Sequence, residues 1–360
     1  MQALKTVIGV VEQSQILQIL SHVKMVAVDS QLTIYASDSE VELITSIPLI
    51  SSVSSEFSVT IPGKKLLDIC RTLPDSSDVS LRFSSNWVNV SADGGIEFTI
   101  ATLPASSFPV LNMQGDITTI TLQERDLFAS LGATSFAMAQ HDVRHFLNGM
   151  LFSFNNGGLS ITATDGHRMA MGKFSLEGCD SSSQAIIPRK AVAELARLLS
   201  SSAATLKILF SADHIRFEAT EFVLSTRLID GSFPACEGLI PEGGDKAVLP
   251  RMLLKQALSR AAVLAKERYH GAKLHFSSNL LRICSNNSDN EKTNESFAIN
   301  YTGEDLTLAF NISYLSDVVN AITSDSVEVV LVGSDKSVLI KPYVDGESAD
   351  FLYVVMPMTL

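Results

Sequence analysis

The residues best suited to chemistry lie close together in the stretch "ITATDGHRMA", residues 161–170. Asp165, His167 and Arg168 follow an alternating run of apolar and polar residues that predicts a strand. A carboxylate near an imidazole is typical of acid–base and nucleophilic sites. The same spacing also suits a tight turn in which Asp165 accepts hydrogen bonds from the backbone. The local sequence leaves both interpretations open.

Other signatures of catalysis are missing from the sequence. It contains no G-x-S-x-G, H-E-x-x-H, P-loop or G-x-G-x-x-G motif. The seven histidines are scattered, and the four cysteines form no C-x-x-C pair. We therefore expect a protein that is not an enzyme and that holds neither a cofactor nor a metal ion.

Composition indicates a globular protein of several domains. The chain has 360 residues, of which 46% are hydrophobic and 18% are charged. At about 100–200 residues per domain, this length predicts two or three domains. No apolar run reaches the roughly 18 residues of a membrane span, and the N-terminal segment lacks a signal-peptide cleavage site. We expect a cytoplasmic protein with reduced thiols and no membrane contact.

The net charge of −12 argues against tight groove binding to nucleic acid. An acidic chain can still carry a local basic stripe, so the distribution of charge matters more than its sum.

Three sequence elements recur in one order at a spacing of roughly 125 residues. The first is an alternating strand that ends in a polar turn, in "LTIYASDSEVEL" (32–43), "LSITATDGHRMA" (159–170) and "LLRICSNNSDNE" (280–291). The second is a strand that leads into a helix, at 59–73, 185–199 and 309–322. The third is a closing strand, at 98–109, 222–234 and 351–360. We therefore predict an α+β fold made of three copies of one unit.

The helices of these units are predicted to be amphipathic, with basic outer faces. In the helix at 64–73 the core face should carry Leu66, Ile69, Cys70 and Leu73, and the outer face Lys64, Lys65, Asp68 and Arg71. After Pro188 the inward residues are Val192, Leu195 and Leu199, and the outward ones Lys190, Glu194 and Arg197. A further helix at 250–265 carries Arg251, Lys255 and Arg260, and its counterpart lies at 122–139. Each face alone is typical of a solvated helix, but recurrence in several copies favours a shared role.

Several motifs resemble those of the bacterial sliding clamp, the beta subunit of the DNA polymerase III holoenzyme. They are "HDVRHFLNGMLF" (141–152), "TATDGHRMA" (162–170), "IPRKAVAEL" (187–195), "FNISYLSDVVNAI" (310–322) and "YVVMPMTL" (353–360). The resemblance covers nearly the whole chain. It implies three clamp domains at 1–113, 114–240 and 241–360, with a first domain whose start looks shortened. It also implies a homodimer ring with antiparallel sheets outside and two helices per domain inside.

The resemblance implies a processivity factor that encircles duplex DNA without sequence readout. A closed ring is held by topology, so weak phosphate contacts are sufficient and permit sliding. The candidate DNA-binding residues are Lys64, Lys65, Arg71, Gln140, His141, His145, Arg189, Lys190, Arg197, Lys255 and Arg260.

In the family, the turn after "TATDGH" helps line a pocket for short peptides of the polymerase alpha subunit, the clamp loader and other clamp-motif proteins. By match, the apolar subsite contains Leu147, Thr164, Gly166, His167, Arg168, Met169, Pro234, Leu239, Val354 and Met356. The adjoining groove contains Arg144, Phe146, Asn311, Tyr314, Ser337, Pro357, Met358 and Leu360. Methionine and leucine supply an adaptable apolar floor for such a peptide. In this interpretation Asp165 caps its own turn.

Some positions depart from the family pattern. Ser14, Gly238 and Thr359 stand where a basic residue is common. The implied dimer interface keeps an apolar centre of Phe98 and Ile100 against Val263 and Leu264. Its charges are altered, because Gly95 and Glu97 stand where arginines face acidic residues in the family, and the facing segment keeps Asp289, Glu291 and Glu295 but gains Lys292. A clamp-like paralogue that binds clamp-motif peptides without encircling DNA is therefore the alternative hypothesis.

Overall fold

The computed structural model describes residues 1–12, 17–75, 77–84, 86–155, 157–176, 182–265, 271–289, 291–344 and 350–358. It contains two compact units, which are described separately below. Unit 1 comprises Met1–Phe128 and Lys190–Leu228, and unit 2 comprises Ala129–Arg189 and Ile229–Leu360. No helix among the described residues is long and apolar enough to cross a membrane.

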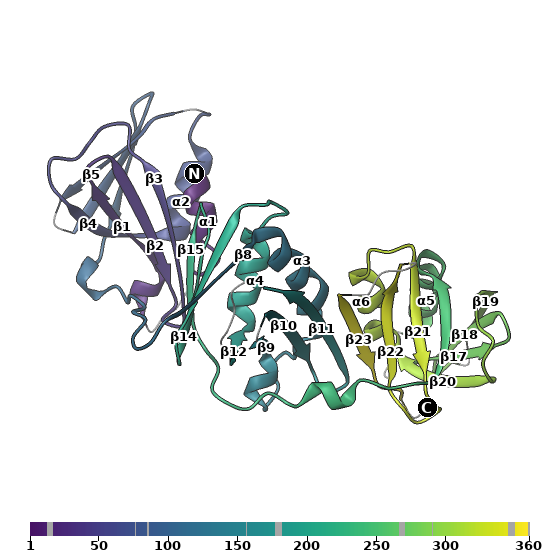
Figure 1. The fold of residues 1–360 in the computed structure, drawn as a ribbon. Helices are drawn as coiled ribbons and strands as arrows, with labels where there is room; N and C mark the ends of the chain where they lie inside the picture. The colour runs from purple at the N-terminus through teal and green to yellow at the C-terminus, as the bar shows by residue number, and fades with distance from the viewer. Residues whose placement is uncertain are drawn as a thin grey trace. The chain divides into compact units, whose positions relative to one another are not determined.

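Unit 1 is built on an eight-stranded antiparallel sheet (Figure 1). The strand order is β4-β1-β2-β3-β15-β14-β13-β8, and a second sheet has the order β5-β6-β7. The elements are α1 (Gln2–Val7), β1 (His22–Val28), β2 (Gln31–Ser37), β3 (Val41–Pro48), β4 (Phe57–Pro62), α2 (Gly63–Thr72), β5 (Val79–Ser84), β6 (Trp87–Ala92), β7 (Ile96–Ala101), β8 (Thr118–Gln123), α4 (Arg189–Leu198), β13 (Thr205–Phe210), β14 (His214–Glu218) and β15 (Val223–Arg227).

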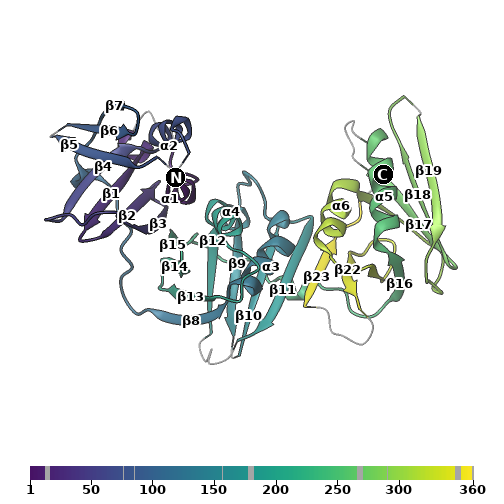
Figure 2. The same cartoon turned by 90° about the horizontal axis from the view of Figure 1, so that it is seen from above.

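Unit 2 repeats the plan with an eight-stranded sheet of order β12-β9-β10-β11-β23-β22-β21-β16 and a second sheet of order β19-β18-β17-β20 (Figure 2). The elements are α3 (Glu124–Thr134, which begins in unit 1), β9 (Gly149–Asn155), β10 (Gly158–Thr164), β11 (Arg168–Ser175), β12 (Ser183–Pro188), β16 (Asp245–Pro250), α5 (Arg251–Leu264), β17 (Gly271–Ser277), β18 (Leu280–Asn286), β19 (Lys292–Ala298), β20 (Leu306–Asn311), α6 (Ile312–Ala321), β21 (Ser326–Leu331), β22 (Val338–Tyr343) and β23 (Phe351–Val355).

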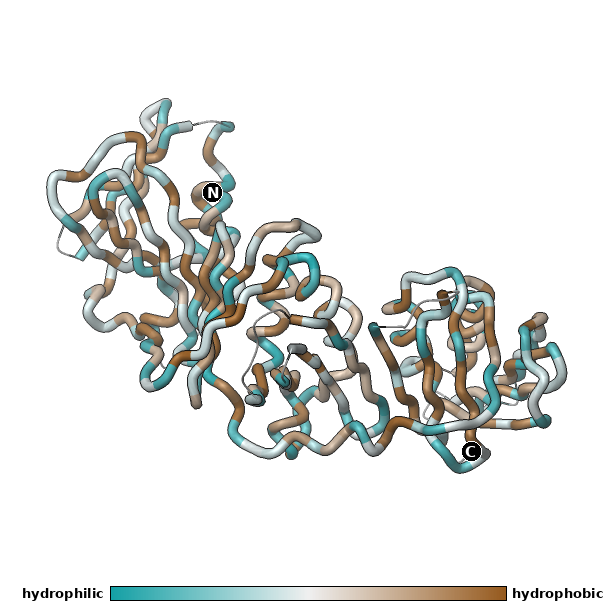
Figure 3. The backbone as a smooth tube through the Cα atoms, viewed as in Figure 1, coloured by the Kyte–Doolittle hydropathy of each residue, from teal (hydrophilic) through white to brown (hydrophobic). Residues whose placement is uncertain are grey.

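The three predicted repeats are present as matching sets of elements. The alternating segments form the hairpins β2–β3, β10–β11 and β18–β19, and the strand-to-helix segments form β4–α2, β12–α4 and β20–α6. The closing strands are β7, β15 and β23. Alternation of apolar and polar residues along the strands is visible in Figure 3, as expected for sheets with one buried face. The α+β fold prediction is confirmed.

Two of the predicted helix faces differ in detail. On α2, Leu66 and Leu67 are buried, whereas Ile69, Cys70 and Leu73 are only half-buried. On α4, Val192, Leu195 and Leu199 are buried as predicted. Glu194 does not face solvent, since its side chain is 13% exposed and lies against Gly9. A glycine at that point leaves room for the carboxylate beside the end of α1.

Candidate functional site

Three hairpin turns of the repeats share one hydrogen-bonding pattern. In the first, Asp38 Oδ1 accepts from the backbone nitrogens of Glu40 at 2.8 Å and Val41 at 2.6 Å. In the second, Asp165 Oδ1 accepts from the backbone nitrogens of His167 at 2.9 Å and Arg168 at 3.0 Å. In the third turn Asn287 Oδ1 also accepts from two backbone nitrogens, those of Asp289 and Glu291, both at 3.0 Å, but its second donor lies four residues on instead of three. Such turns satisfy backbone donors that strand pairing cannot reach.

This pattern answers the question raised by "TATDGH". The other carboxylate oxygen of Asp165 accepts from Arg168 Nε at 3.1 Å, so both oxygens hold the turn together. The imidazole of His167 instead stacks on Tyr314, with ring centroids 6.2 Å apart. The geometry supports turn capping by Asp165 rather than acid–base chemistry.

Arg168 ties this turn to two other parts of unit 2. Its guanidinium donates to Asp317 on α6 and, at 2.9 Å, to the carbonyl oxygen of Phe136. It also lies 4.5 Å from the ring centroid of Tyr314 and 5.2 Å from that of Phe136. The side chain is only 11% exposed. Arg168 therefore fixes the shape of the candidate site, and its donors already have protein partners.

All described residues of the predicted peptide site belong to unit 2. Met169 pairs with Val354 across β11 and β23, and both belong to a buried cluster. The cluster consists of Met169, Met171, Cys236, Val330, Leu339 and Val354, with Phe233, Ile240 and Leu352 packed against it. Leu147, Thr164, Met169 and Val354 are at most 5% exposed, whereas Leu239 and Met356 are 42% and 38% exposed. Leu239 and Met356 therefore supply the accessible apolar surface of the predicted subsite.

The adjoining groove residues are held by backbone and charge contacts. The backbone nitrogen of Met356 donates to His167 O at 3.0 Å, and that of Met358 donates to Ala309 O at 2.7 Å. Asn311 caps α6 by accepting from the backbone nitrogen of Ser313. Phe146 lies against Gly231, and Pro234, Ser337 and Pro357 retain exposed surface. Leu360, like Thr359, lies outside the described residues.

Arg144 borders the turn on the exposed side. It forms an ion pair with Asp142 at 2.9 Å, and the bonds from Arg144 lower the pKa of that carboxyl to about 2. It also donates to Asp165 O at 3.4 Å. Gly166 has φ +88° and lies beside this guanidinium, so a side chain there would be strained and would press on Arg144.

A polar cavity of about 410 Å³ lies next to the turn. Its lining includes Gln140, His141, Arg168, Arg189 and Tyr314. Burial raises the pKa of the Tyr314 hydroxyl, with Asp165 adding to the shift and Arg168 opposing it. Gln140, His141 and His145 are exposed, as a DNA contact requires.

Several of the predicted DNA-binding cations already have partners within their own unit. Lys190 pairs with Asp38 and, at 3.0 Å, with Glu12. Burial lowers the pKa of Lys190, but its bonds to these two carboxylates outweigh burial and raise the pKa overall. Arg189 donates to Met138 O at 3.0 Å, and Arg197 donates to Thr6 O at 2.5 Å.

The remaining cations are more accessible. Lys64 and Lys65 are exposed on α2, and within the described part of the chain no ion pair is recorded for either. Arg71 pairs with Asp68 at 3.0 Å on the same helix. Lys255 is half-buried, and Arg260 pairs with Glu295, which raises the pKa of the arginine and lowers that of the carboxylate.

The predicted dimer-interface residues differ in exposure. Val263 is 65% exposed, and Phe98 and Leu264 are half-buried. Ile100 is 4% exposed. It pairs with the buried Val88 across β6 and β7, so both side chains lie on the buried face of the β5-β6-β7 sheet. Little of the Ile100 surface is left for a partner. Glu295 is engaged by Arg260 of the same chain, and Ser14 lies outside the described residues.

Two residues that hold the site together were absent from the sequence prediction. Asp317 and Phe136 both contact the Arg168 guanidinium. The sequence did contain a signal that could have identified Asp317. An acidic residue lies five residues after the start of each of three helices: Asp68 in α2, Glu194 in α4 and Asp317 in α6.

Comparisons with known proteins agree over the full length of the chain. Family models of the DNA polymerase III beta subunit match its N-terminal domain at residues 1–112, its central domain at 121–235 and its C-terminal domain at 237–359. The beta sliding clamp of Pseudomonas aeruginosa is 39% identical over 100% of this chain and 97% of its own length. That of Escherichia coli K12 is 34% identical over 96% of this chain and 93% of its own.

Solved structures give the same result. A Pseudomonas aeruginosa sliding clamp bound to griselimycin matches with a TM-score of 0.94 at 38% identity, covering 100% of this chain and 96% of that one. A Bartonella birtlesii clamp, also bound to griselimycin, matches with a TM-score of 0.93 at 31% identity, covering 100% and 96%. The chain belongs to the bacterial sliding clamp family, the beta subunits of DNA polymerase III, and its function is that of a DNA polymerase processivity clamp.

Proposed function

We propose that two copies of this chain close head to tail into a ring around duplex DNA, and that the ring tethers its partners through the peptide site of unit 2. The partners are the DNA polymerase III alpha subunit, the clamp loader and other proteins with clamp-binding motifs, in the cytoplasm. The chain itself catalyses no step. It keeps a polymerase close to its template by topology and by peptide capture.

The observation that carries this proposal is the way in which successive repeats pair. In unit 1 the third strand of the first repeat, β3, pairs with the closing strand of the second, β15, with Leu43 opposite Leu224. In unit 2, β11 pairs with β23 in the same register, with Ala170 opposite Tyr353. Each paired residue lies five positions after its turn residue, Asp38 or Asp165.

In both units, the third strand of one repeat pairs with the closing strand of the next repeat. Among the described strands, β19, the third strand of the third repeat, and β7, the closing strand of the first repeat, have no such partner. Both lie at the edge of a sheet. An open edge invites pairing with another chain. When a second copy supplies one of these two strands, their pairing produces a head-to-tail assembly.

Register follows from the same equivalences. Val88 pairs with Ile100 in the first repeat as Ile215 pairs with Thr226 in the second, so Ile100 corresponds to Thr226. Phe98 and Leu224 each lie two residues earlier and therefore correspond to one another. Asn287 accepts from the backbone nitrogen of Glu291 and Asp165 accepts from that of Arg168, so Glu291 corresponds to Arg168. Thr293 and Ala170 each lie two residues later and therefore correspond to one another. Phe98 of one copy should therefore lie opposite Thr293 of the other.

Cysteine cross-linking tests this closure. We expect the double variant Phe98→Cys, Thr293→Cys to form an intermolecular disulfide efficiently, because facing residues in antiparallel strands have Cβ atoms about 4.5–5.5 Å apart. The cross-linked ring, once loaded on nicked circular DNA, should stay bound at high salt. The double variant Phe98→Cys, Ser296→Cys is the control, because Ser296 does not face Phe98 in the proposed register. Efficient cross-linking of the control but not of the test pair would contradict the register, and a monomer at every concentration would favour a paralogue that does not encircle DNA.

We expect contacts with DNA phosphates to come from a few accessible cationic side chains rather than from the whole chain. Lys64 and Lys65 are exposed, whereas Lys190, Arg189 and Arg197 have protein partners. A small number of phosphate contacts gives a weak and salt-sensitive attraction that permits sliding.

Peptide capture rests on the exposed apolar surface of Leu239 and Met356. Burying one leucine or phenylalanine side chain of a peptide there should contribute roughly 1.5–3 kcal/mol. We expect Met356→Glu to abolish saturable binding of an apolar-acidic clamp-motif peptide in a fluorescence titration, and the exposed Val344→Glu to leave binding unchanged. Equal binding by wild type and Met356→Glu would refute the assignment.

A further inference from the structure

The outer edge of β5 is open among the described strands of unit 1. The small sheet has the order β5-β6-β7, so β5 and β7 are its two edges (Figure 2). β7 is the edge proposed above to pair with a second copy, and β5 is the opposite edge. An open edge presents unpaired backbone donors and acceptors, so it can accept a further strand.

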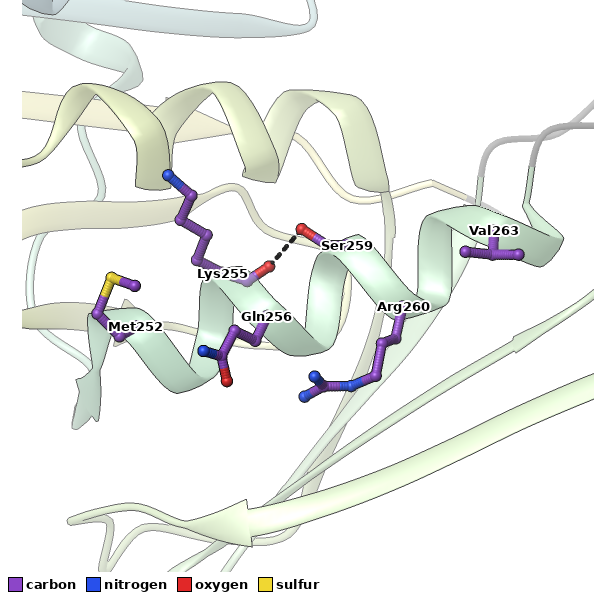
Figure 4. A pocket seen from close by; sticks show the side chains of 6 residues that line it. All are labelled: Met252, Lys255, Gln256, Ser259, Arg260 and Val263. Carbon is purple, nitrogen blue, oxygen red and sulfur yellow. Dashed lines mark hydrogen bonds between the residues drawn. The ribbon is translucent and has the colours of Figure 1, made fainter.

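The strand equivalent to β5 is covered in both other repeats. Each repeat ends in three antiparallel strands, β5-β6-β7, β13-β14-β15 or β21-β22-β23, so β5 corresponds to β13 and β21. β8 pairs with the outer edge of β13, and β16 pairs with that of β21. β8 leads directly into α3, and β16 leads directly into α5, the helix whose side chains are drawn in Figure 4. In the first repeat, no described strand takes this place beside β5.

The strand register shows which residues of β5, β13 and β21 are equivalent. The closing-strand residues Phe98, Leu224 and Tyr353 correspond to one another, as argued above for ring closure. Following the pairing from these residues across two strands leads to Leu81 on β5, Ile208 on β13 and Val329 on β21. Each of the three is the middle apolar residue of an alternating strand.

The apolar face of β5 is exposed where its equivalents are buried. Val79 is 41% exposed, and Leu81 and Phe83 are half-buried. The equivalent side chains of the other two repeats are at most 7% exposed, namely Leu206, Ile208, Phe210, Val327, Val329 and Leu331. The difference marks the surface that a covering strand would bury.

The covering strands share a pattern that defines the chemistry of an occupant. β8 sets Ile120 and Leu122 opposite apolar residues of β13, and β16 sets Ala247 and Leu249 opposite those of β21. These four side chains are at most 7% exposed, and they are the third and fifth residues of their six-residue strands. An occupant of the β5 edge therefore needs apolar third and fifth residues that face the apolar side chains of β5.

Charge defines the second position of the occupant. In the third repeat this position is Lys246, which pairs with Val330 in the register and binds Glu328 at 3.2 Å. The residues of β5 that correspond to Val330 and Glu328 are Arg82 and Ser80. Arg82 is exposed, and within the described part of the chain no ion pair is recorded for it. An acidic second residue would complement Arg82, whereas a lysine would be repelled.

We propose that the outer edge of β5 is a docking site for an extended segment of a partner protein, with an acidic second residue and apolar third and fifth residues. The segment pairs antiparallel with Val79–Ser84, as β8 pairs with β13. In such strand addition, backbone hydrogen bonds give affinity and alternate side chains give selectivity. This site lies in unit 1, apart from the peptide site of unit 2, and it uses the edge of the sheet opposite β7.

A charge-swap experiment with two peptides tests the site. The probes are fluorescent peptides containing TEITLQ, which is the β8 sequence with glutamate at its second position, or TKITLQ. We expect the full chain to bind TEITLQ saturably in an anisotropy titration and to prefer it to TKITLQ, and hydrogen exchange at Val79–Ser84 to slow in its presence. Arg82→Glu should weaken TEITLQ binding about five-fold and strengthen TKITLQ binding about five-fold. Lys173→Glu, an exposed change on β11 in unit 2, is the matched control and should alter neither.

The outcomes separate this inference from the proposed function. A preference that reverses in Arg82→Glu supports the site, and it also shows that the variant still folds. Binding that ignores the charge at the second position, or unchanged exchange in β5, would overturn the proposal. Loss of TEITLQ binding in Met356→Glu would place the peptide in unit 2 and overturn it as well. Self-association of the chain alone that Arg82→Glu changes would assign the edge to a second copy instead. Cross-linking of Phe98→Cys with Thr293→Cys does not involve β5, so the ring is tested independently.

Discussion

The Asp165 side chain serves its own turn, and its equivalents explain why. Asp38 and Asn287 also accept backbone hydrogen bonds at the matching turns. Asn287 carries no charge, so the conserved contribution of this position within the chain is hydrogen-bond acceptance rather than proton transfer. The charge of Asp165 adds a second task, which is to hold Arg168.

Glu42 is the buried carboxyl whose environment has the clearest consequence for stability. It is 1% exposed, one oxygen accepts from the backbone nitrogen of Leu111 at 3.2 Å, and the other has no hydrogen-bond partner among the described residues. Burial raises the pKa of Glu42, although the Leu111 bond and the charges of Arg216 and Lys24 oppose this shift.

Glu42→Gln should therefore change how stability depends on pH. Because the folded-state pKa is raised, the folded chain keeps a proton that the unfolded chain has already lost above its ordinary carboxyl pKa. The favourable contribution of Glu42 is fully present below that ordinary value and is lost as pH rises through the folded-state pKa. Urea unfolding should show the variant more stable than wild type at pH 8, with the difference shrinking toward pH 4. A difference that grows on acidification would contradict this environment.

At the scale of elements, helix packing between repeats depends on polar contacts at helix ends. The C-terminal carbonyls of a helix lack intrahelical partners, and in α1 those of Lys5 and Thr6 receive Arg197 instead. The same helix position in α2 is Arg71, whose recorded bond within the described chain is to Asp68 on the same helix. Equivalent arginines thus have different surroundings in one chain.

This difference can be measured in single variants. We expect Arg197→Ala to lower the free energy of unfolding of unit 1 by about 1–2 kcal/mol, less than a buried charged donor would cost because the side chain is 41% exposed. Arg71→Ala is the matched control and should change it by less than about 0.5 kcal/mol. Urea unfolding of dilute protein, with hydrogen exchange at α1, gives both values. Equal losses in the two variants would contradict a special role for the α1 contact.

At the scale of the whole molecule, ring closure depends on which charges the strand register brings together. Opposing Phe98 and Thr293 sets Glu97 opposite Asn294 and diagonal to Lys292, on one exposed face of the new pair. Diagonal neighbours on a sheet remain within reach of long side chains. Lys292 is therefore expected to offset Glu97.

Lys292→Glu should loosen the ring, since it places two like charges near each other at both interfaces. At about 0–1 kcal/mol per exposed pair, the dissociation constant should rise roughly three- to ten-fold at low salt. The effect should fade as salt shortens the screening length to a few ångströms. Sedimentation at low and high salt measures this, with Lys207→Glu as the control. A salt-independent effect would indicate a steric cause rather than an electrostatic one.

The local elements of the fold were predictable from sequence because their signals are local. Alternation marked β10, the turn residue followed it, and the amphipathic run after Pro188 gave a helix whose buried face was assigned correctly. The peptide-site residues matched a family motif and all described ones fall in unit 2. The partners of Lys190 were not predictable, since Asp38 lies far away in the sequence and only strand pairing brings it near.

The sequence by itself determined the three repeats and the α+β class, because periodicity and turn chemistry are set within short stretches of chain, and its motifs carried the resemblance to the sliding clamp family. The tertiary structure alone decided which charged side chains already have partners, that Ile100 is buried while Val263 is exposed, and that β7 and β19 lie at the edges of their sheets. These properties depend on contacts between distant segments. Burial and charge pairing are set by the surroundings of a side chain, and those surroundings exist only once the sheets have formed.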